Sequence, residues 1–293
     1  MPAAALALVL AAALLHAVWN VAAKKAGGDH RFALVSALMV SVLWLPVAAW
    51  FGWQELPRWG SREWGLVLAS GVVHLLYFTV LLKGYRVSDL TVVYPVARGS
   101  GPLLAVLGAV LLLGESLSVL GLAGVLAVCG GVFAIAGGPR LWRQAHDVAA
   151  RSRVLAGLRW GALTGALIAG YTVIDGFAVK VLLVSPVLLD YVGNVLRLPF
   201  LLPGALVDRR GFAAACRTQW RHALVVAILG PLAYVLVLYA MTLAPLSHVA
   251  PAREVSMLFA ALIGGRLLGE GDRGWRLLGA GCIGAGVFAL ALG

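Results

Sequence analysis

The sequence has little charge for its length. Only 12% of its 293 residues are charged, whereas 62% are hydrophobic. A soluble domain carries about a quarter charged residues, so a fully hydrated surface is excluded. Cysteine is also scarce, and Cys129, Cys216 and Cys282 follow no metal-binding or disulfide spacing. Their apolar neighbours indicate packing, so neither a disulfide framework nor a cysteine-based metal site is expected.

Sequence motifs of enzymes and cofactor sites are also missing. The chain contains no P-loop, no catalytic pair of carboxylates and no Ser-His-Asp set. The segment "GAGCIGAG" at 279–286 matches a dinucleotide-binding pattern, but no strand precedes it and it lies inside an apolar run. We interpret it as a close-packing face of a helix. The sequence therefore predicts no enzyme, no cofactor and no metal.

Long apolar runs recur along the whole chain. Each has about 20 residues, enough for a helix to cross ~30 Å of hydrocarbon. The sequence therefore predicts an all-α membrane protein with about ten transmembrane helices. The first run has no basic segment before it and no cleavage site after it, so we expect it to stay as a span. The runs lie near residues 3–23, 32–52, 64–85, 90–113, 117–137, 157–179, 186–207, 221–243, 246–268 and 274–292.

The net charge of +11 raises the question of a nucleic-acid partner. However, the basic residues are spread over connections between the runs, and the densest group lies in and beside the connection at 139–156. Basic connections normally stay on the cytoplasmic side, facing anionic lipid. We therefore predict a multi-pass protein of the cytoplasmic (inner) membrane that contacts lipid and no nucleic acid, with both termini outside. The basic group is Arg140, Arg143, Arg151, Arg153 and Arg159.

The second half of the chain repeats the first. At an offset of 155 residues (253 − 98), Arg98 falls on Arg253 and "LLGE" at 112–115 falls on "LLGE" at 267–270. "GVFAIA" likewise falls on "GVFALA". One five-helix unit is therefore duplicated. The predicted organisation is a first repeat at 1–138, a basic linker at 139–156 and a second repeat at 157–293.

An odd number of spans in each repeat has a topological consequence. The two units must enter the membrane from opposite sides, which makes them inverted repeats with a shared site near the midplane. This arrangement suits a transporter that opens to either side in turn. A duplicated scaffold without a transport role is the alternative.

The two five-span halves, each with "LLGE" after its fourth span and a glycine-rich fifth span, resemble the EamA-type drug/metabolite transporter superfamily over essentially the whole chain. "HAVWN" in the first span and "VYPVAR" in the fourth are similar to its phosphonate-metabolism-associated branch. The resemblance implies carriage of a small molecule without ATP. It further implies that both termini lie on the cytoplasmic side, the opposite of the orientation that the distribution of basic residues predicts. It also implies a pocket lined by spans one to four and six to nine, with spans five and ten as scaffold or as a homodimer surface.

Arg98 and Arg253 are the candidate anchors for a substrate anion. A guanidinium in hydrocarbon costs several kcal/mol, on the order of 3 by insertion scales, and Arg98 lies about eight residues into its span, ~12 Å deep at 1.5 Å per residue. Snorkelling to the interface is the alternative, and it is more credible for Arg253. Pro95 and Pro251 each free a backbone carbonyl, so we expect broken, water-accessible helices that act as gating elements.

Other polar and aromatic side chains complete the candidate pocket. Interhelical hydrogen bonding and simple packing are the alternatives for them. We predict proton coupling through Asp175 and Glu254, because intramembrane acids often relay protons; pairing of Glu254 with Arg98 or Arg253 is the rival. A stripe of Asp190, Asn194 and Arg197 ranks lower. The remaining candidates for substrate binding are His16, Trp19, Asn20, Tyr77, Tyr94, Tyr171 and Tyr234.

The function expected from these residues is secondary transport of a small anionic or zwitterionic metabolite, such as an amino acid or a phosphonate, by alternating access. One alternative is an efflux carrier for lipophilic cations that uses the aromatic rings. The other is a non-transporting membrane subunit or a component of a lipid-phosphate flippase. The charge of the substrate separates the first two, and transport by the purified protein separates both from the third.

Overall fold

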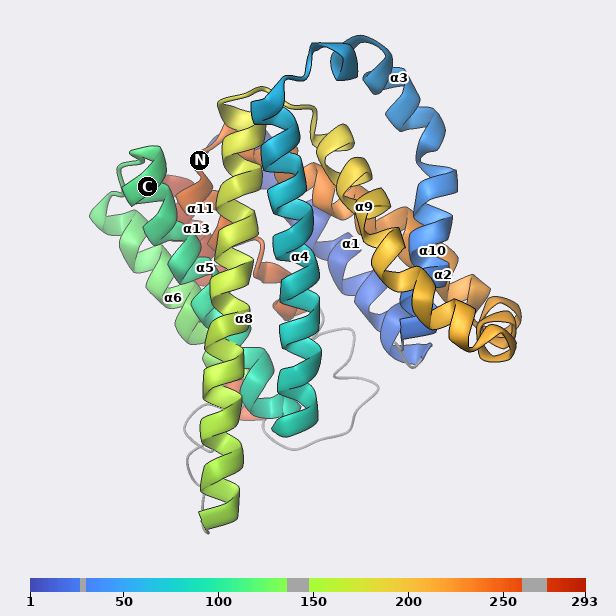
Figure 1. Cartoon of the computed structure of the whole chain (residues 1–293). Helices are drawn as coiled ribbons and strands as arrows, with labels where there is room; N and C mark the ends of the chain where they lie inside the picture. Colours follow the sequence, from blue (N-terminus) through green and yellow to red (C-terminus); the bar gives the residue numbers. More distant parts are fainter. Residues whose placement is uncertain (27–29, 136–147, 260–272) are drawn as a thin grey trace.

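A computed structural model describes residues 1–26, 30–135, 148–259 and 273–293. Apart from one 3-10 turn, η1 (Leu56–Arg58), the regular elements in these residues are α-helices, which confirms the predicted all-α membrane fold (Figure 1). The helices are α1 (Ala3–Lys25), α2 (His30–Leu43), α3 (Leu45–Glu55), α4 (Ser61–Val87), α5 (Leu90–Leu113), α6 (Val119–Ile135), α8 (Val148–Lys180), α9 (Pro186–Val207), α10 (Arg209–Leu243), α11 (Leu246–Ala252) and α13 (Arg273–Leu292).

Several of these helices can cross a membrane. In the described part of the chain, 5 helices are long and apolar enough to do so, and up to 6 spans result if the bent pair α2–α3 counts as one. Helix α6 and residues Leu277–Leu292 are shorter apolar helices. The predicted ninth span is one helix only to Ala252, and residues 260–272 lie outside the described part. The count of ten spans therefore stays a prediction.

The second span is not the single straight helix that the run at 32–52 predicts. Helices α2 and α3 meet at a bend of 57° around Trp44. Pro46 has no N–H to donate to the last turn of α2, so the ladder of hydrogen bonds stops there. The indole N–H of Trp44 donates to the carbonyl of Ala227 in α10 (2.9 Å), which fixes the bend. Within the predicted linker at 139–156, residues from Val148 onward form the first turns of α8, and the bounds of the two repeats stay a prediction.

The two repeats interlock. Helix α1 packs against α10, and its counterpart α8 packs against α4, the counterpart of α10. Helices α2 and α9, which are equivalent, contact each other, as do α6 and α13. Each repeat therefore supplies the packing partners that the other lacks, as a pseudo-twofold relation requires.

Glycines allow α6 and α13 to pack closely. A Cβ on Gly131 would lie 2.6 Å from the carbonyl oxygen of Gly279, and a Cβ on Gly124 would lie 2.8 Å from that of Gly286. These contacts are related by the repeat, because Gly124 is equivalent to Gly279 and Gly131 to Gly286. The segment at 279–286 is thus a close-packing helix face, as its sequence predicts. The homodimer predicted through these spans stays a prediction.

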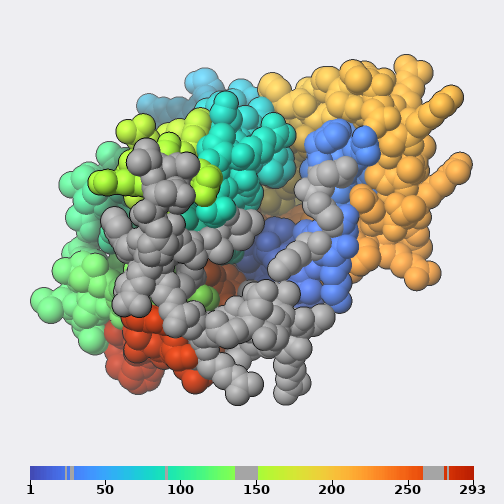
Figure 2. Space-filling view, turned by 90° about the horizontal axis from the view of Figure 1, so that it is seen from below, coloured from blue at the N-terminus to red at the C-terminus, as the bar shows by residue number. Residues whose placement is uncertain are grey.

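The bundle has two distinct ends. Both chain ends lie at one end, which we call the termini face, and the first turns of α8 project from the other, the linker face (Figure 1). Figure 2 shows the linker face, with α4 and α8 on one side and α9 and α10 on the other. The largest buried apolar cluster includes Val9, Val67, Met241 and Leu246, from helix segments near the termini face. Apolar side chains therefore pack between the helices at that end, and the same cluster continues into α6 and α13.

Candidate functional site

A cavity of about 470 Å³ lies between the two repeats. Its walls come from α1, α2, α4, α5, α8, α9 and α10 and from Arg253 and Ser256 after α11, and this volume suits a small molecule. All nine side chains that the sequence predicts for substrate binding line it, although their contact with a substrate stays a prediction. They are His16, Trp19, Asn20, Tyr77, Tyr94, Arg98, Tyr171, Tyr234 and Arg253.

The break after α11 brings Arg253 into this cavity. Pro251 lies in the last turn of α11, which ends at Ala252. The next turn is narrower than an α-helical turn, because the N–H of Glu254 donates to the carbonyl of Pro251, three residues earlier (2.9 Å). The turn directs Arg253 and Glu254, which are neighbours in sequence, toward the first repeat. Pro251 predicts a helix break beside Arg253, and the helix does end there.

The equivalent expectation for Pro95 is wrong. Helix α5 runs without interruption from Leu90 to Leu113 through both Pro95 and Pro102. Helix α8 supports it closely, since a Cβ on Gly161 would lie 2.9 Å from the carbonyl oxygen of Val93. Membrane helices tolerate proline where neighbouring helices pack closely around it. Arg98 therefore projects from a continuous helix.

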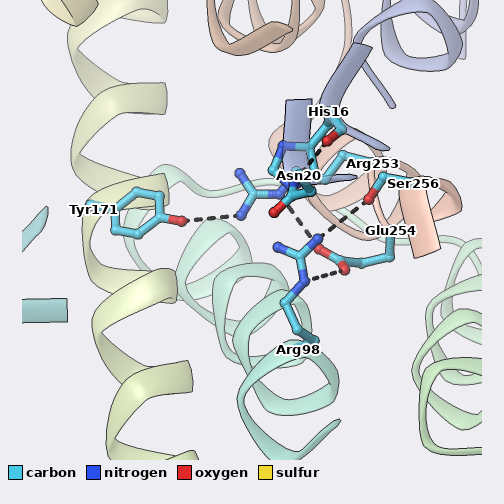
Figure 3. Close-up of polar contacts among 7 residues, drawn as sticks. All are labelled: His16, Asn20, Arg98, Tyr171, Arg253, Glu254 and Ser256. Carbon is cyan, nitrogen blue, oxygen red and sulfur yellow. Dashed lines mark hydrogen bonds and ion pairs between the residues drawn. The ribbon is translucent and has the colours of Figure 1, made fainter. Parts of the chain in front are cut away.

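One carboxylate serves both arginines. Glu254 has no exposed surface, and its Oε2 lies 3.1 Å from Nε of Arg98 while its Oε1 lies 3.6 Å from Nε of Arg253 (Figure 3). Nη2 of Arg98 donates to Ser256 (3.3 Å), and Nη2 of Arg253 donates to the hydroxyl of Tyr171 (3.4 Å). The pairing of Glu254 with the arginines, the rival to a proton-relay role, is thus present. Two guanidinium groups against one carboxylate leave one positive charge uncompensated in this cluster.

Aromatic rings from three helices flank the arginine cluster. His74 of α4 stacks on Tyr171 of α8 with ring centroids 3.9 Å apart, and Tyr77 meets the same ring edge-on at 5.7 Å. Tyr234 of α10 donates its hydroxyl to the buried carboxylate of Asp175. Asp175 therefore lies behind Tyr234 and does not line the cavity, in contrast to the sequence expectation that it faces the pocket.

Helix α9 forms a polar wall that sequence reasoning ranked too low. Asp190, Asn194 and Arg197, spaced along one helix face, all line the cavity. The amide of Asn194 donates to Oδ2 of Asp190 (3.0 Å) and to its backbone carbonyl (2.9 Å). The signal was available, because three polar residues at helical spacing in an apolar span must face away from lipid.

The glutamate of the first "LLGE" segment has a structural role that its sequence context does not reveal. Glu115 accepts the backbone N–H groups of Leu246 and Ser247 (both 2.8 Å) and pairs with Lys180 (2.9 Å). It therefore caps the N-terminus of α11 from the other repeat. Burial alone would raise the pKa of Glu115, but the hydrogen bonds from Ser247, Lys180 and Leu246 outweigh it and lower the pKa below its usual value.

The sequence profile of the EamA-like transporter family matches residues 3–137 and 155–292, which is nearly the whole chain in two segments. The chain belongs to the EamA-like transporter family. This EamA-like chain is also similar to a solved structure described as "Crystal structure of protein", with 16% identity over 100% of this chain and 98% of that one and a TM-score of 0.74. At that identity the likeness shows the fold alone. No curated protein matches the chain. Membership in the family confirms the resemblance drawn from the two "LLGE" segments, and the phosphonate-associated branch stays a prediction.

Proposed function

We propose that this protein is a secondary transporter of the cytoplasmic membrane that carries a small anionic or zwitterionic metabolite by alternating access. One observation carries the proposal: Arg98 of one repeat and Arg253 of the other line the same cavity. Guanidinium groups match carboxylate and phosphonate oxygens with paired hydrogen bonds. Glu254 holds the Nε side of both groups, and one Nη2 N–H of each donates to Ser256 or Tyr171. The remaining Nη N–H groups are the donors available to a substrate.

The charge of the cavity separates this proposal from efflux of lipophilic cations. Three guanidinium groups line the cavity (Arg98, Arg197 and Arg253), and among the described residues the only acid that does so is Asp190. A lipophilic cation would enter a wall with more positive than negative groups, at an electrostatic cost. The aromatic rings around Tyr171 would offset only part of it, since a cation–π contact contributes about 0.5–2 kcal/mol.

Alternating access is supported by the way in which the two faces are built. Buried apolar side chains such as Met241 and Leu246 pack near the termini face, whereas the cavity reaches Ala23 and Phe32, close to the linker-face ends of α1 and α2. Because the repeats are inverted, an exchange of their conformations would open the site to the termini face instead of the linker face while the same residues line it. The break after α11 supplies a pivot next to Arg253, the gating role proposed for Pro251, while Pro95 in the continuous α5 offers a weaker one.

Proton coupling is proposed through Asp175 rather than through Glu254. Tyr234 lines the cavity and donates to Asp175, so a proton can reach this carboxylate through the hydroxyl. Glu254 contacts two guanidinium groups, which suits a fixed counter-ion. Uptake driven by an imposed pH gradient should disappear in Asp175→Asn while counterflow of substrate persists. A gradient response that survives in Asp175→Asn would contradict this coupling.

Reconstitution of the purified protein tests transport directly. Proteoliposomes should show saturable counterflow of labelled carboxylates or phosphonates, with or without an amine. Arg98→Lys keeps the charge but loses the planar fork, so we expect weaker binding; Arg98→Leu should abolish it. Arg62→Leu, at an exposed position on α4, is the control and should leave transport unchanged. Normal transport by a folded Arg98→Leu variant would overturn the proposal, and no transport by the protein alone would favour a non-transporting subunit.

A further inference from the structure

The helix that carries Arg253 to the cavity is short. Helix α11 has 7 residues, about 10 Å at 1.5 Å per residue, and Pro251 lies inside it. Proline donates no N–H, so one of the few hydrogen bonds that this helix could form is missing. All seven residues are buried, but apolar contacts are non-directional. The polar contacts at the two ends of α11 therefore set its place along its own axis.

Among the described residues, the side-chain contacts at the C-terminal end of α11 are long. Nη2 of Arg253 lies 3.4 Å from the hydroxyl of Tyr171, and its Nε lies 3.6 Å from Oε1 of Glu254 (Figure 3). Arg98 is held more closely, with its Nε 3.1 Å from the other oxygen of the same carboxylate. Hydrogen bonds to nitrogen donors are normally about 2.7–3.2 Å long. The place of Arg253 must therefore come from the backbone that carries it.

The N-terminal end of α11 is held by one carboxylate of the other repeat. Glu115, which follows α5, accepts the backbone N–H groups of Leu246 and Ser247 (both 2.8 Å). The same carboxylate pairs with Lys180, the last residue of α8 (2.9 Å). Hydrogen bonds to a charged group are roughly twice as strong as neutral ones, so this is the firmly held end. The other end of the same two-turn helix presents Arg253.

Arg98 reaches the cavity in a different way. It lies inside α5, a continuous helix of 24 residues from Leu90 to Leu113. Asp89, the N-cap residue of α5, makes no side-chain cap bond. One candidate anchor therefore projects from within a long helix without a side-chain cap, and the other projects from the end of a short helix that a distant carboxylate caps.

We infer that Glu115 is a positioning residue for the anion site: by capping α11, it fixes the backbone that places the guanidinium of Arg253 in the cavity. The inference rests on the proposed transport function and adds to it a residue that does not line the cavity. Because only two turns separate the cap from Arg253, a shift of the first turn also moves the last. Loss of the Glu115 charge should therefore weaken anion binding, although no group that touches the anion is removed.

Calorimetry with pentylphosphonate tests this inference on the full-length protein in detergent. Glu115→Gln keeps one acceptor but loses the charge, so the affinity should fall about tenfold, the factor that corresponds to one charge-assisted hydrogen bond. Arg98→Leu should abolish binding. Asp89→Asn, at the start of the helix that carries Arg98, is the matched control and should bind like the unsubstituted protein.

A double substitution separates positioning from a general loss of stability. Arg253→Lys keeps the charge but replaces the planar fork by a flexible point charge, so its binding depends less on the place of the backbone. In that background Glu115→Gln should change the affinity by less than about twofold, because the two substitutions act on the same contact. An equal, tenfold loss in both backgrounds would show a merely structural role of Glu115 and would overturn the inference.

The single substitutions separate this inference from the proposed function. Unchanged affinity in Glu115→Gln, with binding still lost in Arg98→Leu, overturns the inference and leaves the anion site intact. No Arg98-dependent binding of pentylphosphonate overturns the inference together with the anion site. If Glu115→Gln does not fold, Glu115→Asp takes its place, since it keeps the charge but reaches one methylene less far. A smaller loss in the same direction is then expected, and unchanged affinity would again contradict the positioning role.

Discussion

The α6–α13 contact and the arginine site are built from equivalent segments of the two repeats, but the equivalence holds only in the first. At the contact, the repeat relation maps the pair Gly124–Gly286 onto the pair Gly131–Gly279, and the close approaches are nearly equal. At the site, α5 is continuous through Arg98, whereas the chain breaks at Arg253. Glu254 follows the second arginine, and Gly99 takes its place after the first.

This difference shows which parts of a duplicated fold can stay symmetric. Helix packing needs only small residues at matched positions, so both repeats satisfy it in the same way. Two buried guanidinium groups need a counter-ion, and one carboxylate between them is enough to serve both. A second acid at position 99 would remove the excess positive charge that we propose for anion binding. The asymmetry is therefore consistent with a site that keeps one uncompensated positive charge when no substrate is bound.

The largest effect is expected from removing the shared counter-ion. Glu254→Gln leaves Arg98 and Arg253 buried without a carboxylate, and breaking a buried ion pair from one side costs about 3–5 kcal/mol. We expect the free energy of unfolding to fall by that amount in chemical denaturation of the purified protein in detergent. Glu63→Gln, at an exposed helix start, is the control and should change little. An unchanged stability of Glu254→Gln would mean that cavity water, and not Glu254, compensates the arginines.

Substitutions at the glycine contact should have a smaller effect that is equal in the two repeats. Gly131→Ala places a Cβ 2.6 Å from the carbonyl oxygen of Gly279, and Gly286→Ala places one 2.7 Å from that of Gly124. We expect each to lower the free energy of unfolding by about 1–3 kcal/mol through overpacking. Gly130→Ala, next in sequence and with nothing within 4 Å, should be neutral or slightly stabilising. If the two substitutions lower the free energy of unfolding by different amounts, the contact between α6 and α13 is not symmetric.

Much of the fold and the lining of the cavity could be predicted from the sequence, for a simple physical reason. A polar or charged side chain in an apolar span must face away from lipid, so residues such as His16 and Arg98 point to the interior. Features that depend on contacts between distant segments could not be predicted. Pro46 indicates the bend at Trp44, but the bond that holds it comes from a carbonyl of α10. The position of Asp175 behind Tyr234 depends on the packing of α8 against α10.

The capping of α11 by Glu115 offers a further test of the difference between the repeats. Glu115 satisfies two N–H groups at the start of α11, whereas Asp89, the N-cap residue of α5, makes no side-chain cap bond. Glu115→Gln retains one acceptor but loses the charge and the pair with Lys180. We expect a loss of about 1–2 kcal/mol in the free energy of unfolding. Asp89→Asn should change it by a few tenths at most. Equal effects of the two substitutions would show that the cap does not distinguish α11 from α5.

The smallest expected effect is the pH dependence of this cap. The lowered pKa of Glu115 means that the folded protein binds its proton less readily than the unfolded chain does. Its stabilisation is therefore fully present above the usual pKa of 4.5 and is lost as the pH falls through the lower folded value. The difference in stability between the unsubstituted protein and Glu115→Gln should be constant at neutral pH and should shrink below about pH 4.5. Denaturation midpoints of the two proteins, measured in parallel across that range, give this difference directly, because other titrating groups contribute equally to both. A difference that grows on acidification would mean that the Glu115 carboxyl is protonated in the folded protein, and its charge could not then stabilise the start of α11.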